Sequence, residues 1–384
     1  MTGVLDGVRV LEVAGIGPGP FCGMLLADLG ADVVVVERPG GAARARPQQI
    51  TRRGKRSIVL DLKAPGAIEA LLKVVERSDA LIEGMRPGVM ERIGLGPDVC
   101  LARRPSLVYG RITGWGQDGP LAQLAGHDSN YTALSGALWF ASPPGQPQVM
   151  PATMMGDVGG GALYLAIGLL AGVLRARADG TGQVVDAAMV DGVGHMMNLL
   201  LGMIASRGTG FARGSAGFDS AHWAGRSYRC ADGQWVNIAS LEPQFYSELL
   251  RRLGLDGDRR FVDGQMDPKA WPALTAELEQ LFATRTRAQW CDTFEGSDAC
   301  FAPVLDPRDA AAHPHMAARG VYREVDGVLQ TAPAPRFSAT PSRADPPPVP
   351  PPGAHTHEVL SDAGLSPADI ERLARSSALG PSTP

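Results

Sequence analysis

Short apolar runs rich in β-branched residues recur along the first part of the chain, with helical patterns between them. The runs are residues 8–13, 33–36, 58–62, 80–82 and 106–111, and the helical patterns cover 21–29 and 65–77. The run at 33–36 is apolar on both faces, as a buried parallel strand is. Because strand–helix–strand units join parallel strands through a crossover helix, this order predicts an open α/β sheet.

The pattern changes after a last strand at 182–189 and a long helical segment at 190–206. Residues 207–227 are rich in Gly, Ser and Ala and predict a linker before a second unit. In that unit, apolar runs on either side of Asp232-Gly233 predict a hairpin, and Pro243 fits the first position of a helix that Glu242 caps. Further elements are expected at 243–253, 271–284, 287–295, 322–331 and 366–374, with a Pro-rich stretch at 346–352.

Composition limits the kind of protein. The 384 residues can form two domains, and 45% hydrophobic with 20% charged residues is ordinary for a globular chain. A formal net charge of −4 gives no global attraction to nucleic acid or to an anionic membrane. The five cysteines are scattered without a C-x-x-C pair, which indicates reduced thiols rather than a zinc site or a disulfide framework. With no signal peptide visible, a cytoplasmic protein is expected.

Residues 156–174 place one acidic residue, Asp157, ahead of a group of glycines and an apolar run of about 15 residues. That length is short for a membrane span and ordinary for a buried helix. Asp157 is predicted to cap or immediately precede the helix, where backbone N–H groups favour a carboxylate. Two interpretations stay open: a structural cap on a core helix, or a helix start that the glycines leave accessible to a ligand.

His127 has a similar setting, in a Gly-containing loop ahead of a helix expected from near Thr132. One interpretation is a structural histidine that bonds local backbone. The other is that both helix starts face one cleft, so that an imidazole and a carboxyl group flank a bound molecule. Removal and return of a proton need that arrangement.

Two further motifs concern phosphate groups. Gly15-x-Gly17 imitates the dinucleotide fingerprint, but Pro20 stands where the third glycine would be and Pro18 removes a backbone donor, so NAD is not expected. A basic loop follows, made of Arg44, Arg46, Arg52, Arg53, Lys55 and Arg56. Such a run is either a solvated face or, beside the ends of predicted strands, a site for an anion such as a nucleotide phosphate.

The chain also carries several long motifs in a fixed order, at residues 13–20, 54–63, 83–88, 126–131, 156–161, 182–191 and 242–246. These motifs resemble the α-methylacyl-CoA racemases of the type III CoA-transferase superfamily. The resemblance implies an α/β fold with an open, Rossmann-like large domain built from both chain ends, a smaller α+β domain and an interlocked homodimer. It implies domain limits of 1–190 for the first part of the large domain, 191–224 for a linker helix and loop, 225–318 for the small domain, 319–329 for a second linker and 330–384 for the return to the large domain and the C-terminal tail.

The same resemblance implies the site residues. His127 and Asp157 match the two proton-transfer residues, and Glu242 matches a carboxylate paired with the histidine. The site would lie between the large domain of one subunit and the small domain of the other. The positions that match coenzyme A contacts are Arg38, Leu60, Asp61, Leu62, Lys63, Gly84, Met85, Arg86, Arg92, Gly126, Asp128, Asn130 and Tyr131. No metal or separate cofactor is implied, because coenzyme A is part of the substrate.

The implied reaction interconverts (2R)- and (2S)-2-methylacyl-CoA thioesters through an enolate. His127 takes a proton from one face while Asp157 delivers one to the other, and the roles reverse for the opposite enantiomer. The helix start at Asp157 is expected to supply N–H donors to the enolate oxygen. Met154 and Met155 would give a flexible apolar wall for the acyl chain.

Two alternatives remain open. In transferase relatives the aspartate at this position is a nucleophile that forms an acyl anhydride. Those relatives commonly carry a Gly-rich loop in the small domain, whereas residues 239–246 contain no glycine here, which favours the racemase. Residues 216–226 and Thr153 depart from the racemase pattern near the expected acyl chain, so a changed acyl preference is expected. A non-catalytic CoA-binding homologue is the second alternative.

Overall fold

The computed structural model describes residues 3–40, 49–215, 222–340 and 346–379. Contacts between residues divide the chain into two compact units. The first unit comprises residues 1–135, 151–196 and 315–384, and the second comprises 136–150 and 197–314. The stretch 136–150 therefore belongs by its contacts to the second unit, although it lies within the range expected for the large domain.

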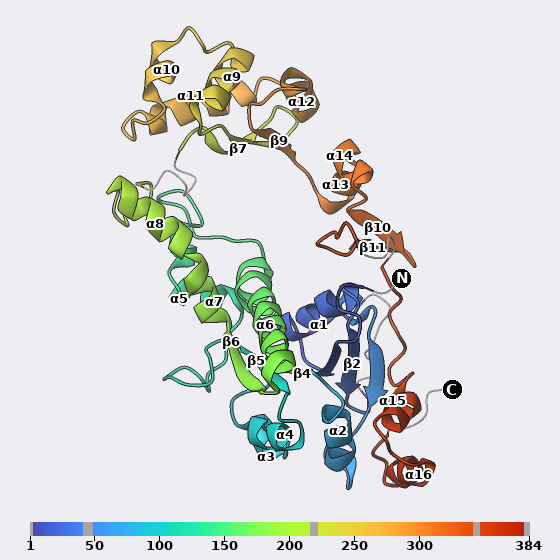
Figure 1. Ribbon diagram of the computed structural model, residues 1–384. Coiled ribbons are helices and arrows are strands. Elements are labelled where there is room, and N and C mark those ends of the chain that lie inside the picture. The colour runs from blue at the N-terminus through green and yellow to red at the C-terminus, as the bar shows by residue number, and fades with distance from the viewer. Residues whose placement is uncertain (1–2, 41–48, 216–221, 341–345, 380–384) are drawn as a thin grey trace. The chain divides into compact units, whose positions relative to one another are not determined.

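A parallel sheet of six strands forms the centre of the first unit (Figure 1). Its strands are β1 (Arg9–Val13), β2 (Asp32–Glu37), β3 (Arg56–Val59), β4 (Ala80–Glu83), β5 (Val108–Thr113) and β6 (Gln183–Ala188). The order is β3-β2-β1-β4-β5-β6, and every neighbouring pair is parallel. The predicted open α/β sheet is confirmed. Its carboxyl edge is divided between β1 and β4, where the strand order reverses and where such sheets bind ligands.

Helices cover both faces of this sheet. Helices α1 (Pro18–Asp28) and α6 (Leu163–Asp179) pack on one face. The other face carries α2 (Ala67–Val75), α4 (Pro97–Arg103), α15 (Thr356–Asp362) and α16 (Pro367–Arg375). Val33 belongs to the first layer, whereas Val34 and Val36 belong to the second. Because the centre of β2 is buried on both faces, its four central residues, 33–36, are all valine.

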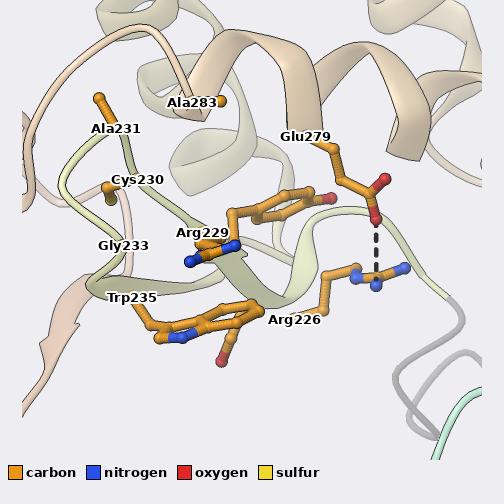
Figure 2. A pocket seen from close by; sticks show the side chains of 10 residues that line it. Arg226, Arg229, Cys230, Ala231, Gly233, Trp235, Glu279 and Ala283 are labelled. Atoms are coloured by element: carbon orange, nitrogen blue, oxygen red, sulfur yellow. Dashed lines mark hydrogen bonds and ion pairs between the residues drawn. The ribbon is translucent and has the colours of Figure 1, made fainter.

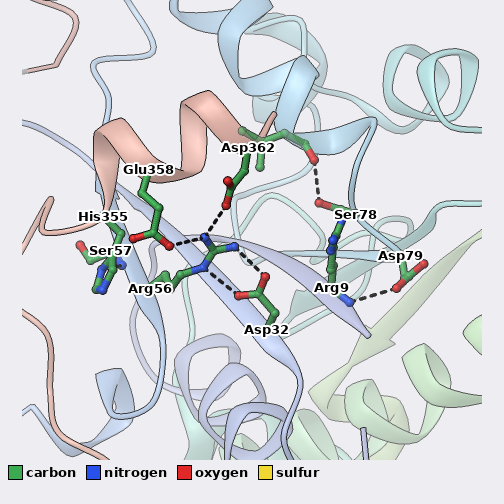
Figure 3. Close-up of polar contacts among 10 residues, drawn as sticks. Arg9, Asp32, Arg56, Ser57, Ser78, Asp79, His355, Glu358 and Asp362 are labelled. Atoms are coloured by element: carbon green, nitrogen blue, oxygen red, sulfur yellow. Dashed lines mark hydrogen bonds and ion pairs between the residues drawn. The ribbon is translucent and has the colours of Figure 1, made fainter. Parts of the chain in front are cut away.

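The C-terminal segment returns to the edge of the sheet at β3 (Figure 3). The Arg56 guanidinium donates to both carboxylate oxygens of Asp32, at 2.9 and 2.6 Å, and also to Glu358 and Asp362 of α15, at 3.1 and 3.0 Å. Alongside, the Ser57 N–H donates to His355 Nδ1 at 3.1 Å. These contacts hold residues from the two ends of the chain together.

The remaining elements of the first unit lie in the segments that connect or follow the strands of the sheet. They are η2 (Ile50–Arg52), α3 (Val89–Arg92), α5 (Asp128–Leu134), η4 (Met154–Ala162), α7 (Met189–Met196), β10 (Tyr322–Val325) and β11 (Val328–Thr331). Helix α14 (Pro314–Ala318) begins at the residue where the sequence passes from the second unit to the first. Strands β10 and β11 form an antiparallel pair. The short strands expected near 322–331 are thereby confirmed.

The second unit contains an antiparallel sheet of three strands, β7 (Gly225–Arg229), β8 (Trp235–Ala239) and β9 (Phe301–Val304). The hairpin predicted at Asp232-Gly233 is confirmed: Gly233 has a φ of +78°, and the Gln234 N–H donates to Asp232 Oδ1 at 3.1 Å. The helices are η3 (Ala137–Phe140), α8 (Asn198–Arg207), α9 (Pro243–Leu253), α10 (Arg259–Gly264), α11 (Trp271–Phe282), α12 (Arg287–Phe294) and α13 (Pro307–Ala312). Their core is aromatic, with Tyr228 stacked on Phe282 at 4.9 Å between ring centroids.

Some helices differ from the sequence prediction. The single helix expected over 190–206 is two helices, α7 and α8, separated at Met197. Helices α10 and α15 were not expected, because a helix of six or seven residues is too short to show a clear apolar period. The apolar run of about 15 residues after Asp157 covers only part of the helix that contains it. Together η4 and α6 form a helix of 26 residues.

By length and composition this long helix could cross a membrane, and it is the one such helix in the described part of the chain. The core helix of a globular domain passes the same test. Leu165, Leu169 and Val173 of α6 are buried in the layer between the sheet and the helices. The side of α6 that carries these residues is therefore a packing face of the domain core.

Candidate functional site

Asp157 lies in the first turn of η4, a stretch of π-helix that leads directly into α6. The residue that precedes this helix is Thr153, whose φ of +62° lies in the left-handed region. Asp157 is therefore neither the cap nor the residue before it, and the prediction of a cap at Asp157 is wrong by one turn. Stretches of π-helix are rare in proteins, and those that do occur are often at functional sites.

The amides at the start of η4 are already bonded within the chain. Asp128 Oδ1 accepts from the N–H groups of Gly156 at 2.5 Å and Asp157 at 2.7 Å. The Val158 N–H donates to the Thr153 carbonyl at 3.1 Å. The expectation that this helix start offers its N–H groups to an enolate is therefore wrong for these three amides.

His127 directly precedes α5, and its side chain is exposed. The His127 N–H donates to Asn130 Oδ1 at 3.0 Å, and the Asn130 N–H donates back to the His127 carbonyl at 2.8 Å. Asn130, which was expected to contact coenzyme A, thus holds the backbone of His127. Because Asp128 follows His127 and bonds the Asp157 amide, the structure brings the two helix starts together.

The Asp157 carboxyl group is half-buried, and burial raises its pKa above the ordinary value. The negative charge of Asp128 raises the pKa of Asp157 further, while His127 acts in the opposite direction. A raised pKa favours the proton-bearing carboxyl group, which is the form that can deliver a proton.

The loop after β1 lies against the same carboxyl group. A Cβ placed on Gly17 would lie 3.5 Å from Asp157 Oδ2, and Gly17 has a φ of +69°. Helix α1 begins at the next residue, Pro18. A Cβ at that distance would be in ordinary van der Waals contact, so the positive φ of the turn at the carboxyl end of β1, and not a lack of space beside Asp157, is what favours glycine here.

The glycines of η4 serve helix packing. A Cβ on Gly160 would lie 2.6 Å from Val193 Cγ2, and one on Gly161 would lie 2.8 Å from Met189 Cγ, both in α7. Gly192 of α7 approaches the Gly160 carbonyl so closely that any Cβ there would overlap it. The interpretation that Gly160 and Gly161 admit a ligand is wrong, because their missing side chains let η4 and α7 touch.

Tyr131 supports the loop that carries His127. Its ring meets Trp115 edge-on with centroids 4.7 Å apart, and a Cβ on Gly126 would lie 2.7 Å from the Tyr131 ring. Burial, followed by the Asp157 charge, raises the pKa of Tyr131. Trp115 was not singled out in the sequence, and a lone aromatic residue in a Gly-rich loop gives no periodic signal that could have found it.

The other predicted coenzyme A residues follow the carboxyl ends of neighbouring strands. Arg38 comes after β2, residues 60–63 come after β3, and residues 84–86 come after β4. The side chains of Arg38, Lys63, Arg86 and Arg92 are exposed, as is Gly84, while Asp61, Leu62 and Met85 are half-buried and Leu60 is buried. Because the sheet is parallel, Arg38, residues 60–63 and residues 84–86 share one edge with the Gly17 loop.

The basic loop does not form an anion site as a whole. Arg44 and Arg46 lie outside the described residues. The other four side chains form ion pairs: Arg52 with Glu37 (2.6 Å), Arg53 with Asp28 (2.5 Å), Lys55 with Glu12 (2.5 Å) and Arg56 with Asp32 (2.6 Å). The Lys55 and Glu12 side chains are 0% and 2% exposed. The anion interpretation is wrong for these four residues.

Glu242 belongs to the second unit, where it is exposed and precedes α9. Its predicted cap position, with Pro243 first in the helix, is confirmed, although its side chain accepts no capping hydrogen bond. Glu242 lies near Cys300: burial raises the pKa of that thiol, and the Glu242 charge raises it further. The pairing of Glu242 with His127 stays a prediction.

The second unit also contains a pocket of about 510 Å³ beside β7, β8 and α11 (Figure 2). Arg229 and Trp235 line it, together with Arg226, whose guanidinium lies 3.5 Å from Glu279. No predicted site residue lines this pocket. Across the described residues, no group of three or more His, Cys, Asp and Glu side chains is arranged to hold a metal ion.

Known proteins resemble this chain over almost its whole length. The family model for CoA-transferase family III matches residues 5–356. The α-methylacyl-CoA racemase of Homo sapiens is 39% identical over 380 residues and that of Mus musculus is 38% identical over 377 residues, each covering 96% of both chains. A CaiB/BaiF family protein from Brucella suis has a solved structure that matches with a TM-score of 0.80 at 25% identity, covering 94% of this chain and 100% of that chain. This chain therefore belongs to CoA-transferase family III.

Proposed function

We propose that this chain is a racemase or epimerase that inverts the α-carbon of 2-methylacyl-CoA thioesters by transferring a proton through an enolate. The observation that carries the proposal is the meeting of the His127 and Asp157 helix starts through Asp128. The racemases of Homo sapiens and Mus musculus, similar over 96% of this chain, support the choice of reaction.

The two groups have suitable chemistry for opposite faces of one carbon. The imidazole of His127 is exposed and can accept the α-proton, while the half-buried Asp157, whose pKa is raised, can deliver a proton from the other side. For the opposite enantiomer the roles reverse. No metal or separate cofactor enters this proposal, since the thioester itself acidifies the α-carbon.

The enolate oxygen needs N–H donors other than the amides of Gly156 and Asp157, which bond to Asp128. Within α5, the bonds back to the His127 carbonyl begin with the Asn130 and Tyr131 N–H groups. The two preceding amides, those of Asp128 and Ser129, have no such partner within the helix, since the first N–H groups of any helix lack one. We therefore assign donation to the enolate oxygen to the start of α5, beside His127.

The substrate would lie along the carboxyl edge of the sheet. The exposed Arg38 and Arg86 follow strand ends there, the exposed Arg92 closes α3, and all three can bind the phosphates of coenzyme A. Met154 is 65% exposed and Met155 is also exposed, three and two residues before Asp157 respectively. These unbranched side chains would give the acyl chain an adaptable apolar surface.

The functional form would be a homodimer. On α6, Leu163, Ile167 and Leu174 lie on one helix face and are exposed, the last two by 65% and 73%. Leu199 of α8 is 75% exposed. Exposed apolar faces of this kind mark interaction surfaces, and a second copy of the chain would also supply Glu242 to His127. Sedimentation equilibrium should give twice the mass of one chain, and a monomer at micromolar concentration would contradict the dimer.

The reaction is tested by incubating one enantiomer of a 2-methylacyl-CoA in deuterated water. The wild-type chain should exchange the α-hydrogen and produce the other enantiomer. His127→Ala and Asp157→Asn should each lower the rate of inversion by roughly 10²–10⁴. Inversion at the wild-type rate in both variants would remove the assignment. A panel of 2-methylacyl and aryl-propionyl thioesters would identify the acyl group.

CoA transfer to a free carboxylic acid is the second candidate, supported by the transferase family model that the chain matches. In that case the Asp157 carboxylate attacks the thioester, coenzyme A leaves as the thiolate, and an acyl anhydride forms on the enzyme. Hydroxylamine should then trap an acyl group at Asp157. Coenzyme A binding with neither exchange nor transfer would instead indicate a non-catalytic homologue. Residues 216–221 of the divergent 216–226 segment lie outside the described residues.

A further inference from the structure

Asp128 occupies an unusual place between the two proposed proton-transfer groups. It is the first residue of α5, directly after His127, and it is 8% exposed. Its Oδ1 accepts from the amides of Gly156 and Asp157 at 2.5 and 2.7 Å. A Cβ on Gly156 would lie 2.6 Å from the same oxygen, so only glycine allows this approach.

We propose that Asp128 is a positioning residue, whose carboxylate joins the start of η4 to the start of α5 and so holds Asp157 and His127 on opposite sides of the substrate carbon. This inference rests on the proposed function. It replaces the expectation that Asp128 contacts coenzyme A, because the Asp128 oxygen is turned toward the chain itself. Two charge-assisted hydrogen bonds to successive amides fix both the position of the first turn of η4 along the helix axis and its rotation about that axis.

Asp128 also acts on Asp157 through its charge. The titratable groups that face Asp157 in the described residues are Asp128, His127 and Tyr131, all on or directly before α5. Gly17, the residue directly before α1, lies against the Asp157 carboxyl group and has no titratable side chain. Burial is the first cause of the raised Asp157 pKa, and the Asp128 charge is the second. Removing that charge should lower the pKa of Asp157 and reduce its proton-bearing form at neutral pH.

Two variants separate position from charge. Asp128→Asn keeps an oxygen that can accept from both amides but removes the charge. Asp128→Ala removes the oxygen and the charge together. If Asp128 positions Asp157, Asp128→Asn should retain the KM for the thioester within about threefold and lose roughly tenfold in kcat at neutral pH. Asp128→Ala should lose about a further hundredfold in kcat, as expected when a reacting group is displaced by about 1 Å.

The pH profile gives a readout that a structural role alone would not change. In Asp128→Asn, the limb of kcat/KM that follows Asp157 should move to lower pH, because the Asp128 charge that raises the pKa of Asp157 is gone. Asp186→Asn is the matched control, because Asp186 also accepts from a backbone amide, that of Gln117 at 3.1 Å, in the same unit. This control should leave the profile in place. Thermal unfolding should show that Asp128→Asn is folded, which keeps the test informative if Asp128→Ala does not fold.

The result that overturns the proposal is an unchanged kcat and pH profile in folded Asp128→Asn together with a kcat in Asp128→Ala equal to that of Asp128→Asn. A separate measurement distinguishes this failure from failure of the proposed function. The ¹³C-labelled Asp157 carboxyl group can be titrated by NMR in the substrate-free protein. If the wild type inverts no thioester, the proposed function fails, while a lower Asp157 pKa in Asp128→Asn would still establish the coupling.

Discussion

The first unit has two groups of basic side chains, one packed against α1 and one at the carboxyl edge of the sheet. Those against α1 form buried ion pairs, whereas those at the carboxyl edge do not. Beneath α1, Lys55 and Arg53 each bond a carboxylate at 2.5 Å and are almost fully buried. At the carboxyl edge, Arg38 and Arg86 are exposed, and no ion pair to a described residue is seen for them.

The difference teaches that a run of basic residues does not by itself indicate an anion site. Lys55 Nζ donates to Glu12 and to the Pro20 carbonyl at 2.9 Å, so it joins β1 to the start of α1. A Cβ on Gly23 would overlap Glu12, which leaves no room for a larger residue above the pair. The paired charges stabilise the scaffold, whereas the unpaired ones at the strand ends remain available to a ligand.

Asp157→Asn should separate activity from stability most strongly. Inversion should fall by roughly 10²–10⁴, because the amide cannot deliver a proton. Burial and the Asp128 charge raise the folded-state pKa of Asp157 above its ordinary value, so its ionised form opposes folding once the pH exceeds that ordinary value. The free energy of unfolding at neutral pH should therefore equal or exceed that of the wild type. A variant that loses stability in urea denaturation would show that Asp157 belongs with the structural charges.

Lys55→Met should show the reverse behaviour. Removing one partner of a buried pair costs about 3–5 kcal/mol in the free energy of unfolding. Burial raises the pKa of Glu12 and Lys55 lowers it, so the variant raises it further. A carboxyl group with a raised pKa destabilises the fold only as pH rises above its ordinary, unfolded-state value. The loss should be large at about pH 8 and smaller at about pH 5, and an equal loss at both would contradict the buried-pair assignment.

Substitutions of the α7 glycines test whether close packing against α7 holds η4 in place. Gly192→Ala should cost about 1–3 kcal/mol, because its Cβ overlaps the Gly160 carbonyl of η4. Gly194→Ala is the matched control on the same helix, since a Cβ there meets no described atom within 4 Å. The control should gain about 0.5–1 kcal/mol from helix propensity. Chemical denaturation measures both, and equal changes would contradict close packing of η4 on α7.

Arg38→Met should have the smallest effect on the fold and a moderate one on binding. The side chain is exposed, so the free energy of unfolding should change by no more than about 0.5 kcal/mol. Loss of one charged hydrogen bond to a phosphate should weaken coenzyme A binding about tenfold. Isothermal titration with coenzyme A checks the affinity. Unchanged affinity would show that Arg38 does not bind coenzyme A. A large loss of stability would show that Arg38, like Lys55, stabilises the fold.

Local pattern alone determined the strands of the parallel sheet, the hairpin at Asp232-Gly233 and the start of α9 at Pro243. Each depends on residues close together in the sequence: apolar runs, turn residues or a proline at a helix start. The motifs likewise identified the family and named His127 and Asp157. Those signals survive in the sequence because the chemistry and the turns require particular residue types.

Only the tertiary structure decided what those residues touch. It paired Lys55 with Glu12, used the glycines of η4 to admit α7, and placed Asp128 on the Asp157 amide. In the contacts of Asp128 and Lys55, the two partners are at least 28 residues apart in the sequence. The sequence around one partner gives no signal that predicts the other. Distances, burial and hydrogen-bond directions are set only when distant parts of the chain pack together. The sequence pattern therefore located the proposed reacting residues but could not predict which residues hold them in place.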